Sequence, residues 1–468
     1  MEVNNHALGA LSPLDGRYHR EVKDLAPLVS ESGLINYRLR VEAAWLLHLA
    51  SEPAVAHELT WSPSARSLLE GLARGEGPSS AARVREIEQS TNHDVKACEY
   101  HLRELLAAAG ANTRALAFVH FALTSEDVNN LAYALMLEEA RKSQILPLMD
   151  AILLDLRAKA AQYASTAMLA RTHGQPASPT TLGKEFAVFG HRLTRQREHF
   201  AKLRLEGKLN GAVGNYNAHL AAYPDVDWID MTRRFIEQGL GLVQNPFTTQ
   251  IENHDSMIEY LDALRRFDII LIGLARDLWG YIAIGHFSQK LRDSEVGSST
   301  MPHKVNPIDF ENAEGNLGIA CALIQHFAEK LPISRWQRDL SDSTVQRNLG
   351  TILGHSAVAM KSMLKGLSKI TAEEDRIARE LNGAWEVLAE PIQTVMRRYG
   401  IIDAYERLKE ATRGRPVTED LLRDLIRNCP EIPKPERERL LTLTPSTYTG
   451  WAARLAQDFA ARPLAGGS

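Results

Sequence analysis

Apolar side chains recur near helical spacing, with charged side chains between them, in one long stretch from residue 257 to residue 287. A helix of about thirty residues would reach roughly 45 Å. Because the stretch is apolar over much of its circumference, we expect it to pack on several neighbours, including other subunits. The apolar positions are Ile258, Leu261, Leu264, Ile269, Ile272 and Trp279.

The same spacing recurs in four further stretches, whereas the alternation typical of strands is sparse. The pattern predicts an all-α protein with a central bundle of long helices. We expect Pro147 to kink or break one of them, because proline has no backbone N–H to donate. The four stretches are residues 127–164, 181–206, 310–330 and 348–370.

Loop-rich regions divide this pattern into three predicted domains. An N-terminal helical region ends near Gly110 to Thr113, and short amphipathic pieces separated by RGRPV, NCPEIPKPE and TPSTY follow residue 370. The predicted domains are an N-terminal helical domain at 1–113, the central long-helix bundle at 114–367 and a C-terminal helical domain at 368–468.

Composition limits the partners and the compartment. The 468-residue chain has 54 basic and 58 acidic residues, so its net charge of −4 gives no general attraction to nucleic acid or to an anionic membrane. The uncharged run between Asp268 and Arg276 is far shorter than the ~20 residues of a membrane span. Cys98, Cys321 and Cys429 are widely separated, and the first residues lack a signal-peptide pattern. We therefore expect a cytoplasmic protein that binds neither nucleic acid nor membrane.

Several polar segments interrupt the helical patterns. In ARTHGQPASPTTLGKE, Ser178 and Pro179 are typical of a helix N-cap and first turn, and we expect a helix to restart there. His173 stands at the break beside Thr172 and Gln175. A lone histidine is more often structural than catalytic, but its ordinary pKa near neutrality would suit a general acid.

Two other segments are explained by local structure alone. Asn92, His93 and Asp94 are typical of a turn whose side chains bond their own backbone. Thr124 and Asp127 have the spacing of a capping box, with Ser125 between them. Neither segment requires a ligand.

The segment SRWQRDLSDSTVQRNLG combines arginines with hydroxyl groups, which together suit a phosphate dianion. Asp339 and Asp342 make a solvated helix start with internal ion pairs an equally good interpretation. Because the basic and aromatic interleaving of nucleic-acid channels is missing, a small phosphorylated ligand is favoured over a polymer. The residues concerned are Arg335, Arg338, Ser341, Ser343, Thr344 and Arg347.

Motifs for other chemistries are missing from the sequence. It contains neither G-x-G-x-x-G nor a Walker lysine loop, and its sixteen histidines show no metal-binding spacing. The run that begins at Gly297 is not G-x-S-x-G and lacks the preceding strand of a serine hydrolase. We expect neither a cofactor nor a metal.

The run GSSTMPHKVNP at 297–307 resembles the signature loop of the fumarase/aspartase superfamily, whose members cleave C–N or C–O bonds and release fumarate. Within it, the chain is similar to the adenylosuccinate lyase family of the longer bacterial type. The resemblance covers nearly the whole chain and weakens after about residue 416. The other matching runs are DGRY (15–18), STNHDVKA (90–97), TSED (124–127), RTHGQPA (171–177), TTQIE (248–252), SRWQRDLSDSTVQRN (334–348) and WEVLAEPIQTVMRRYG (385–400).

This resemblance implies the superfamily's all-α long-helix fold and a homotetramer in which each active site draws residues from three chains. It implies elimination of fumarate from adenylosuccinate, giving AMP, and from the purine intermediate SAICAR, giving AICAR. Ser298 would be the base and His173 the general acid, with His93 as a possible assistant. The residues implied in substrate binding are Arg17, Tyr18, Asn92, His93, Asp94, Thr124, Ser125, Gln250, Ser299, Lys304, Val305, Asn306, Asn312, Arg338, Ser343, Thr344 and Arg347.

Alternatives remain open at this stage. Residues alone would favour a histidine as the base, and only the family precedent selects Ser298 over Ser299. Fumarase, aspartase and argininosuccinate lyase share the loop, although MPHK and the arginine-rich segment favour a nucleotide substrate. A non-catalytic protein on the same scaffold would need none of His173, Ser298, Lys304 and Asn306, and a helical nucleic-acid binder is disfavoured by charge.

Overall fold

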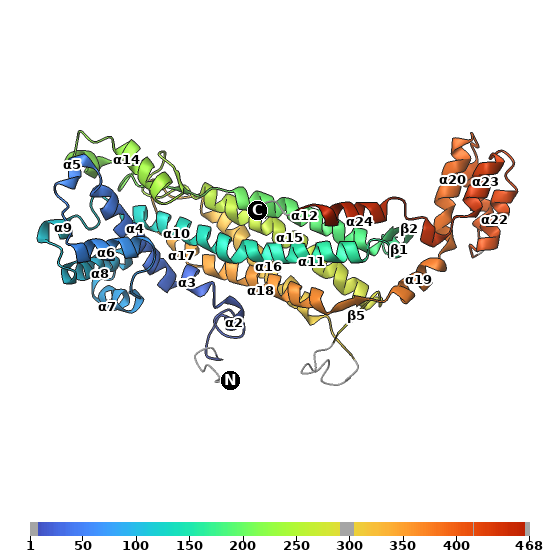
Figure 1. The fold of residues 1–468 in the computed structure, drawn as a ribbon, viewed down its shortest axis with the longest axis horizontal. Helices are drawn as coiled ribbons and strands as arrows, with labels where there is room; N and C mark the ends of the chain where they lie inside the picture. Colours follow the sequence, from blue (N-terminus) through green and yellow to red (C-terminus); the bar gives the residue numbers. More distant parts are fainter. Residues whose placement is uncertain (1–7, 291–303, 415, 464–468) are drawn as a thin grey trace. The chain divides into compact units, whose positions relative to one another are not determined.

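The computed structural model describes residues 8–290, 304–414 and 416–463, and its chain is mainly helical (Figure 1). It divides into two compact units. The first unit comprises Met1–Met149, Gln196–Ile269 and Gly315–Lys361. The second unit comprises Asp150–Arg195, Ile270–Glu314 and Ser362–Ser468. The predicted all-α fold is confirmed, and the division into three domains stays a prediction.

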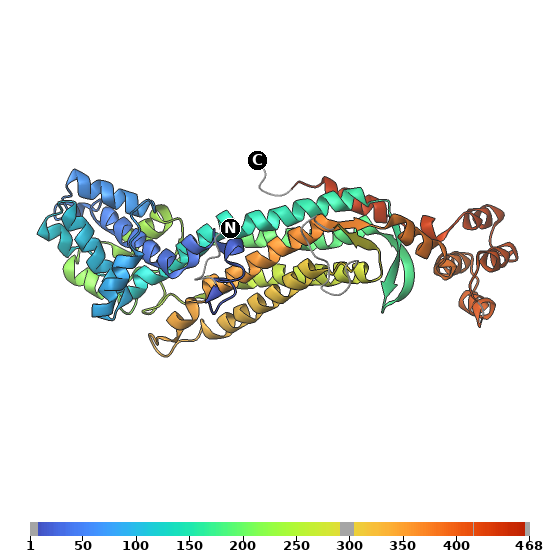
Figure 2. The same cartoon turned by 90° about the horizontal axis from the view of Figure 1, so that it is seen from below.

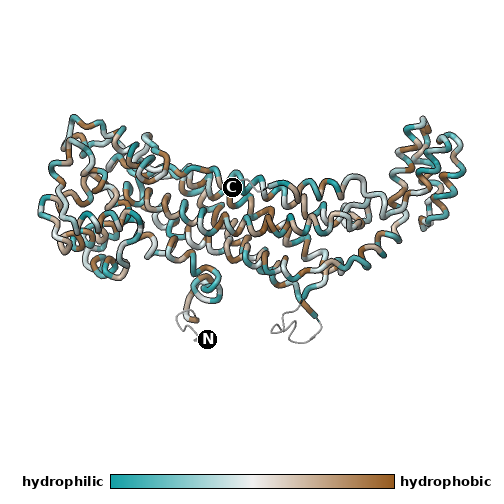
Figure 3. Tube along the Cα trace, viewed as in Figure 1, coloured by the Kyte–Doolittle hydropathy of each residue, from teal (hydrophilic) through white to brown (hydrophobic). Residues whose placement is uncertain are grey.

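Five long helices contribute residues to both units, and they match the stretches with helical spacing. The stretch at 257–287 forms a helix of 29 residues, and three others form helices with closely similar bounds. The stretch at 127–164 comprises α10 (Ser125–Ala140), η1 (Arg141–Ile145) and α11 (Leu146–Gln162). Figure 3 shows hydrophobic and hydrophilic segments alternating along them. These helices are α11 (Leu146–Gln162), α12 (Leu182–Lys202), α15 (Asp255–Ala283), α16 (Ile308–Lys330) and α18 (Leu349–Lys369).

The first unit is organised around α4, which packs against α3, α6, α7, α8 and α10. The Ser30 hydroxyl caps α4 by accepting the Gly33 N–H at 3.2 Å, and Trp45 on this helix is fully buried. The elements of this unit are α2 (His19–Val22), α3 (Ala26–Val29), α4 (Glu31–Leu49), α5 (Pro53–Ala56), α6 (Pro63–Ala73), α7 (Ala81–Thr91), α8 (Asp94–Ala108), α9 (Thr113–Ala117), α10 (Ser125–Ala140), η1 (Arg141–Ile145), β3 (Glu206–Gly207), α13 (Asn217–Ala222), α14 (Trp228–Arg234), η2 (Phe235–Gly239), β4 (Val243–Gln244) and α17 (Ser341–Gln346).

The second unit combines a β-hairpin, a short strand pair and a cluster of C-terminal helices with its own apolar core. Leu169 of the hairpin belongs to that core, which otherwise comes from residues after 380. The elements are β1 (Ala167–Thr172), β2 (Gln175–Thr181), β5 (Phe287–Gln289), β6 (Ile370–Ala372), α19 (Glu374–Asn382), η3 (Trp385–Leu388), α20 (Ala389–Arg398), α21 (Ala404–Thr412), α22 (Glu419–Arg427), α23 (Lys434–Leu441), η4 (Pro445–Thr447) and α24 (Ala452–Ala461).

The helix containing Pro147 is not broken there. Between α10 and α11 the chain forms one π turn, η1, in which the Leu146 N–H donates to the Arg141 carbonyl. Pro147 cannot donate to the carbonyl four residues before it, and a π turn is one way in which a helix accommodates such a missing hydrogen bond. The expected disturbance is therefore a local change of hydrogen-bond spacing rather than a break.

The expected helix restart at Ser178 and Pro179 is wrong. Both residues lie in β2, which pairs with β1 in an antiparallel hairpin visible in Figure 2. The next helix begins at Leu182, and the Thr181 hydroxyl accepts the Lys184 N–H at 3.2 Å. A capping residue therefore exists, but the extended strand runs three residues past Ser178 before the helix can start.

Asp268 on α15 is fully buried, and the Ser356 hydroxyl donates to it at 2.7 Å. Burial raises the pKa of Asp268 to about 7, above its unfolded value of 3.8. The folded state therefore holds a proton that the unfolded state releases, so this group's contribution to stability is full below the unfolded pKa and is lost as pH rises towards 7.

Asp268→Asn should consequently remove a pH-dependent destabilisation. We expect the variant to gain stability relative to the unaltered chain as pH rises from 4 to 7, by up to about 4 kcal/mol. Urea unfolding of both proteins at several pH values measures this difference. A difference that does not change with pH would contradict a neutral Asp268 in the folded state.

Candidate active site

The predicted site residues that the structure describes fall into two groups, one in each unit. Ser298 and Ser299 lie outside the described residues. In the second unit lie His173, Lys304, Val305, Asn306 and Asn312. In the first unit lie Arg17, Tyr18, Asn92, His93, Asp94, Thr124, Ser125, Gln250, Arg338, Ser343, Thr344 and Arg347.

The turn predicted at Asn92 to Asp94 is present and joins α7 to α8. Asn92 ends α7 in the left-handed conformation, with φ of 49°, which asparagine tolerates better than most residues. His93 is the N-cap of α8, and its Nδ1 accepts the Lys96 N–H at 3.2 Å. Its ring remains half exposed. The capping bond fixes the ring orientation and leaves Nε2 as the nitrogen available to a ligand.

Asp94 lies between two arginines. Its Oδ2 accepts from Arg38 Nη2 at 2.8 Å and from Arg347 Nη2 at 2.9 Å, while its Oδ1 accepts the Val95 N–H. Burial disfavours the charged carboxylate, but Arg38, the Val95 N–H and Arg347 together outweigh it, so the pKa of Asp94 is lowered. Arg347 also donates to Glu31 at 2.6 Å. Arg347, which is predicted to bind the phosphate, is therefore already paired with two carboxylates of its own chain, Asp94 and Glu31.

The capping box at the start of α10 is confirmed, with the Thr124 N–H donating to Asp127 at 2.8 Å. Asp127 is fully buried and forms an ion pair with Lys208 at 3.1 Å. Lys208, also fully buried, donates to the Gln250 carbonyl at 2.7 Å. The ion pair therefore fixes the Thr124–Ser125 turn and the Gln250 loop relative to one another within the first unit.

Gln250 and Arg338 share a hollow of about 400 Å³ on the first unit, a size that suits a small ligand. Arg338 Nη1 donates to the Gln250 side-chain carbonyl at 3.2 Å, and its Nη2 lies 3.1 Å from Glu126. Both are among the predicted substrate-binding residues. The lining residues are Ala212, Val213, Gln250, Trp336, Gln337, Arg338, Asp339 and Leu340.

The remaining first-unit residues are accessible. Ser343 and Thr344 lie on the short helix α17, between Arg338 and Arg347, with Thr344 exposed. Arg17 is exposed and Tyr18 half-buried, just before α2. These residues could reach a ligand without a rearrangement of the core.

His173 and Gly174 form the two-residue turn between β1 and β2, since Thr172 pairs with Gln175. Their φ values of 56° and 75° are those of a type I′ turn, in which both residues are left-handed. His173 is exposed at the tip. Glu380 anchors the turn end of the hairpin by pairing with Arg171 on β1, two residues before His173, and it also pairs with His286 at 2.6 Å.

Lys304 to Asn306 lead directly into α16. The Val305 carbonyl accepts from the Gln289 amide at 3.1 Å, and Lys304 is exposed. Asp309 anchors the helix start to α18 through Lys369 at 2.8 Å and Lys365 at 3.2 Å. The ion pairs therefore fix the backbone that follows Lys304 and Asn306, and Asn312 lies one turn further along α16.

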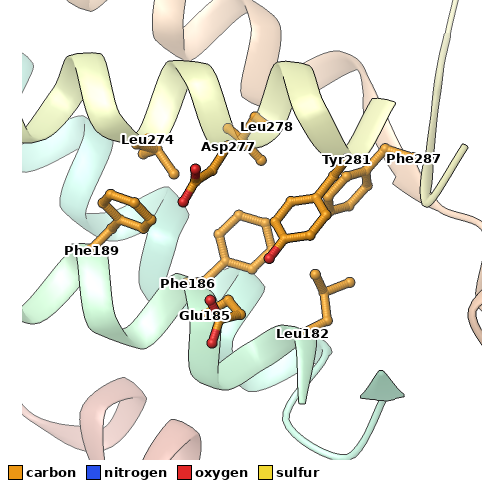
Figure 4. Close-up of a pocket in the computed structure, with 9 residues that line it drawn as sticks. All are labelled: Leu182, Glu185, Phe186, Phe189, Leu274, Asp277, Leu278, Tyr281 and Phe287. Carbon is orange, nitrogen blue, oxygen red and sulfur yellow. The ribbon is translucent and has the colours of Figure 1, made fainter. Parts of the chain in front are cut away.

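A separate apolar hollow lies between α12 and α15 in the second unit (Figure 4). Two carboxyl groups, Glu185 and Asp277, border it, and burial raises the pKa of each. Its described lining contains none of the predicted site residues. The lining consists of Leu182, Glu185, Phe186, Phe189, Leu274, Asp277, Leu278, Tyr281 and Phe287.

Residues 16–322 match the family model described as "Lyase", and residues 334–449 match "Adenylosuccinate lyase C-terminal". The chain is similar to proteins named "Adenylosuccinate lyase" from Haemophilus influenzae (52% identical, covering 96% of this chain and 98% of the relative), Vibrio cholerae (51%; 96% and 98%) and Escherichia coli K12 (49%; 98% and 100%). The similarity thus continues well past residue 416, where we expected it to weaken.

Solved structures share the fold at low identity. A 3-carboxy-cis,cis-muconate lactonizing enzyme from Pseudomonas putida superimposes with a TM-score of 0.74 at 21% identity, covering 94% of this chain and 96% of that one. A fumarate lyase from Mesorhizobium sp. BNC1 gives 0.73 at 18% identity, covering 94% and 98%.

The long-helix fold and the lyase match define a member of the fumarase/aspartase superfamily, a class of enzymes that release fumarate. Within this class the C-terminal match and the full-length relatives separate the nucleotide-acting branch from the others. The chain belongs to the adenylosuccinate lyase family.

Proposed function

We propose that this chain eliminates fumarate from adenylosuccinate to give AMP, and from SAICAR to give AICAR, in purine nucleotide biosynthesis. The observation that carries the proposal is the 49–52% identity to three proteins named "Adenylosuccinate lyase" over at least 96% of the chain. Arg338 and Arg347 flank α17, which carries the hydroxyl groups of Ser343 and Thr344. This grouping of arginines and hydroxyl groups in one unit supports a phosphorylated substrate.

The elimination needs a base, an acid and a group that stabilises negative charge. In the proposed reaction Ser298, as its alkoxide, takes the proton from the carbon next to a carboxylate. The electrons of that C–H bond form the double bond of fumarate, the C–N bond breaks, and His173 as imidazolium protonates the departing nitrogen.

The carboxylate next to the reacting carbon gains charge in the transition state, and Lys304 and Asn306 are proposed to bind it there. The exposure of Lys304 and of His173 leaves both accessible to a substrate. Lys304 would also help to stabilise the Ser298 alkoxide, because a serine hydroxyl is a poor base in water.

We further propose a cytoplasmic homotetramer with shared active sites. Several large apolar side chains on α15 and α16 are exposed in the single chain, and burial against other subunits would remove them from water. The side chains are Ile269, Trp279, Ile308 and Ile319. A light-scattering mass equal to that of one chain would contradict the proposed homotetramer. Among the described residues, no helix is long and apolar enough to cross a bilayer.

The proposal is tested by incubating the purified protein with adenylosuccinate and, separately, with SAICAR. We expect fumarate and AMP from the first and fumarate and AICAR from the second. Malate, aspartate and argininosuccinate serve as control substrates of other superfamily reactions, and none of them should yield fumarate. No fumarate from either nucleotide would overturn the proposed function.

A further inference from the structure

Arg38 is a buried cation that the sequence motifs do not include. It lies on α4, its side chain is 2% exposed, and it contacts two other helices. Its Nη2 donates to Asp94 on α8 at 2.8 Å, and its Nε donates to Asn129 on α10 at 2.9 Å. The guanidinium carries a permanent charge, because arginine does not deprotonate in proteins.

The first branch of these contacts leads to Arg347. Arg38 and Arg347 donate to the same oxygen, Asp94 Oδ2. Arg347 is 39% exposed and reaches outward to Glu31. Asp94 is thus a bridge between a buried arginine and an accessible one.

The second branch leads to Arg338. Asn129 Nδ2 donates to Glu126 at 2.7 Å, and the same Glu126 oxygen lies 3.1 Å from Arg338 Nη2. Both arginines that we assign to the nucleotide are therefore connected to Arg38, Arg347 through the half-buried Asp94 and Arg338 through the buried Asn129 and Glu126. A helix-packing role alone would not require Arg38 to be connected to both.

The charges explain what Arg38 contributes. Asp94 and Glu31 together would cancel Arg347 and leave an excess negative charge. With Arg38 beside Asp94, the four groups sum to zero. Because Asp94 shares its negative charge between Arg38 and Arg347, it neutralises Arg347 only partly. An anion that takes the place of Glu31 is therefore attracted by the remaining positive charge of Arg347.

We propose that Arg38 is a positioning residue that holds Asp94 and supplies the buried positive charge through which Arg347 binds the phosphate of a nucleoside monophosphate in place of Glu31. The inference rests on the proposed function, because that function assigns Arg347 to the phosphate. Asp94 orients Arg347, and Arg38 prevents Asp94 from neutralising it.

The test compares the affinities of AMP and of adenosine, which lacks the phosphate, by calorimetry on the full-length protein. Arg38→Gln should weaken AMP binding by about 10- to 100-fold, the cost expected for the loss of a charged hydrogen-bonded partner, while adenosine binding changes less than threefold. Arg38→Lys keeps the charge but cannot reach both partners, so it should restore part of the AMP affinity.

Arg141→Gln is the matched control. Arg141 is another buried arginine of the first unit, 3% exposed and paired with Glu138 at 2.6 Å, but it contacts none of the predicted site residues. Its loss should lower stability without changing the ratio of AMP to adenosine affinity. An Arg38 variant whose ratio equals that of Arg141→Gln would overturn the inference.

If Arg38→Gln does not fold, Arg38→Lys decides the question. The inference then requires that Arg38→Lys lowers the ratio of AMP to adenosine affinity more than Arg141→Gln does. Turnover of adenylosuccinate by the unaltered protein is measured first. Its absence would overturn the proposed function, whereas normal turnover with an unchanged AMP-to-adenosine ratio in the Arg38 variants would overturn this inference alone.

Discussion

His173→Asn is expected to lower kcat by about 10²- to 10⁴-fold while leaving the β1–β2 hairpin intact. The loss has the size of a removed general acid. Asparagine is the informative replacement, because His173 has a φ of 56° and is followed by Gly174, and Asn-Gly is a preferred type I′ turn. Steady-state kinetics measures kcat, and circular dichroism with thermal unfolding checks the fold.

His57→Asn serves as the control, because His57 is an exposed histidine outside the proposed site. Its kcat should equal that of the unaltered enzyme. If His173→Asn keeps more than about a tenth of the normal kcat, His173 is not the acid, and His93, with its free Nε2, becomes the next candidate.

Ser298→Ala is expected to abolish turnover, with a loss of at least about 10³-fold, while adenylosuccinate still binds near normally. The methyl side chain removes the atom proposed to take the proton and leaves the binding groups Lys304 and Asn306 in place. Single-turnover assays give the rate of the chemical step, and calorimetry with the inactive variant gives the substrate affinity.

Ser299→Ala separates the two neighbouring serines. Since Ser299 is proposed to bind substrate, its loss should raise KM more than it lowers kcat. If Ser298→Ala retains most of its activity while Ser299→Ala is inactive, the base is Ser299 rather than Ser298.

The long helices could be predicted from the sequence because their signal is local. A period near 3.6 over some twenty residues requires no knowledge of what packs against the helix. The hairpin could not be predicted in the same way. Its turn, His173–Gly174, lacks the Asn-Gly or Asp-Gly pair that marks most type I′ turns, and its second strand, β2, contains two prolines. Packing of β1 on α19 and of β2 on η3 selects the extended form.

The site residues could be predicted because they stand in contiguous runs with a family resemblance. Their partners were missed, because they lie in ordinary helical sequence. Arg38 is 56 positions from Asp94, and Glu31 is 316 positions from Arg347. No local pattern distinguishes Arg38 from the arginine two residues later on the same helix.

The sequence by itself determined the helical class and the family, and it led to the proposed side chains for an elimination, because periodicity, motif spacing and chemical type are all properties of short segments. The tertiary structure decided which charges meet. It placed His173 on an exposed turn and put Arg38 behind Asp94. Such pairings depend on which helices pack together in three dimensions, and the energy of a buried charge depends on partners that the chain brings from far away.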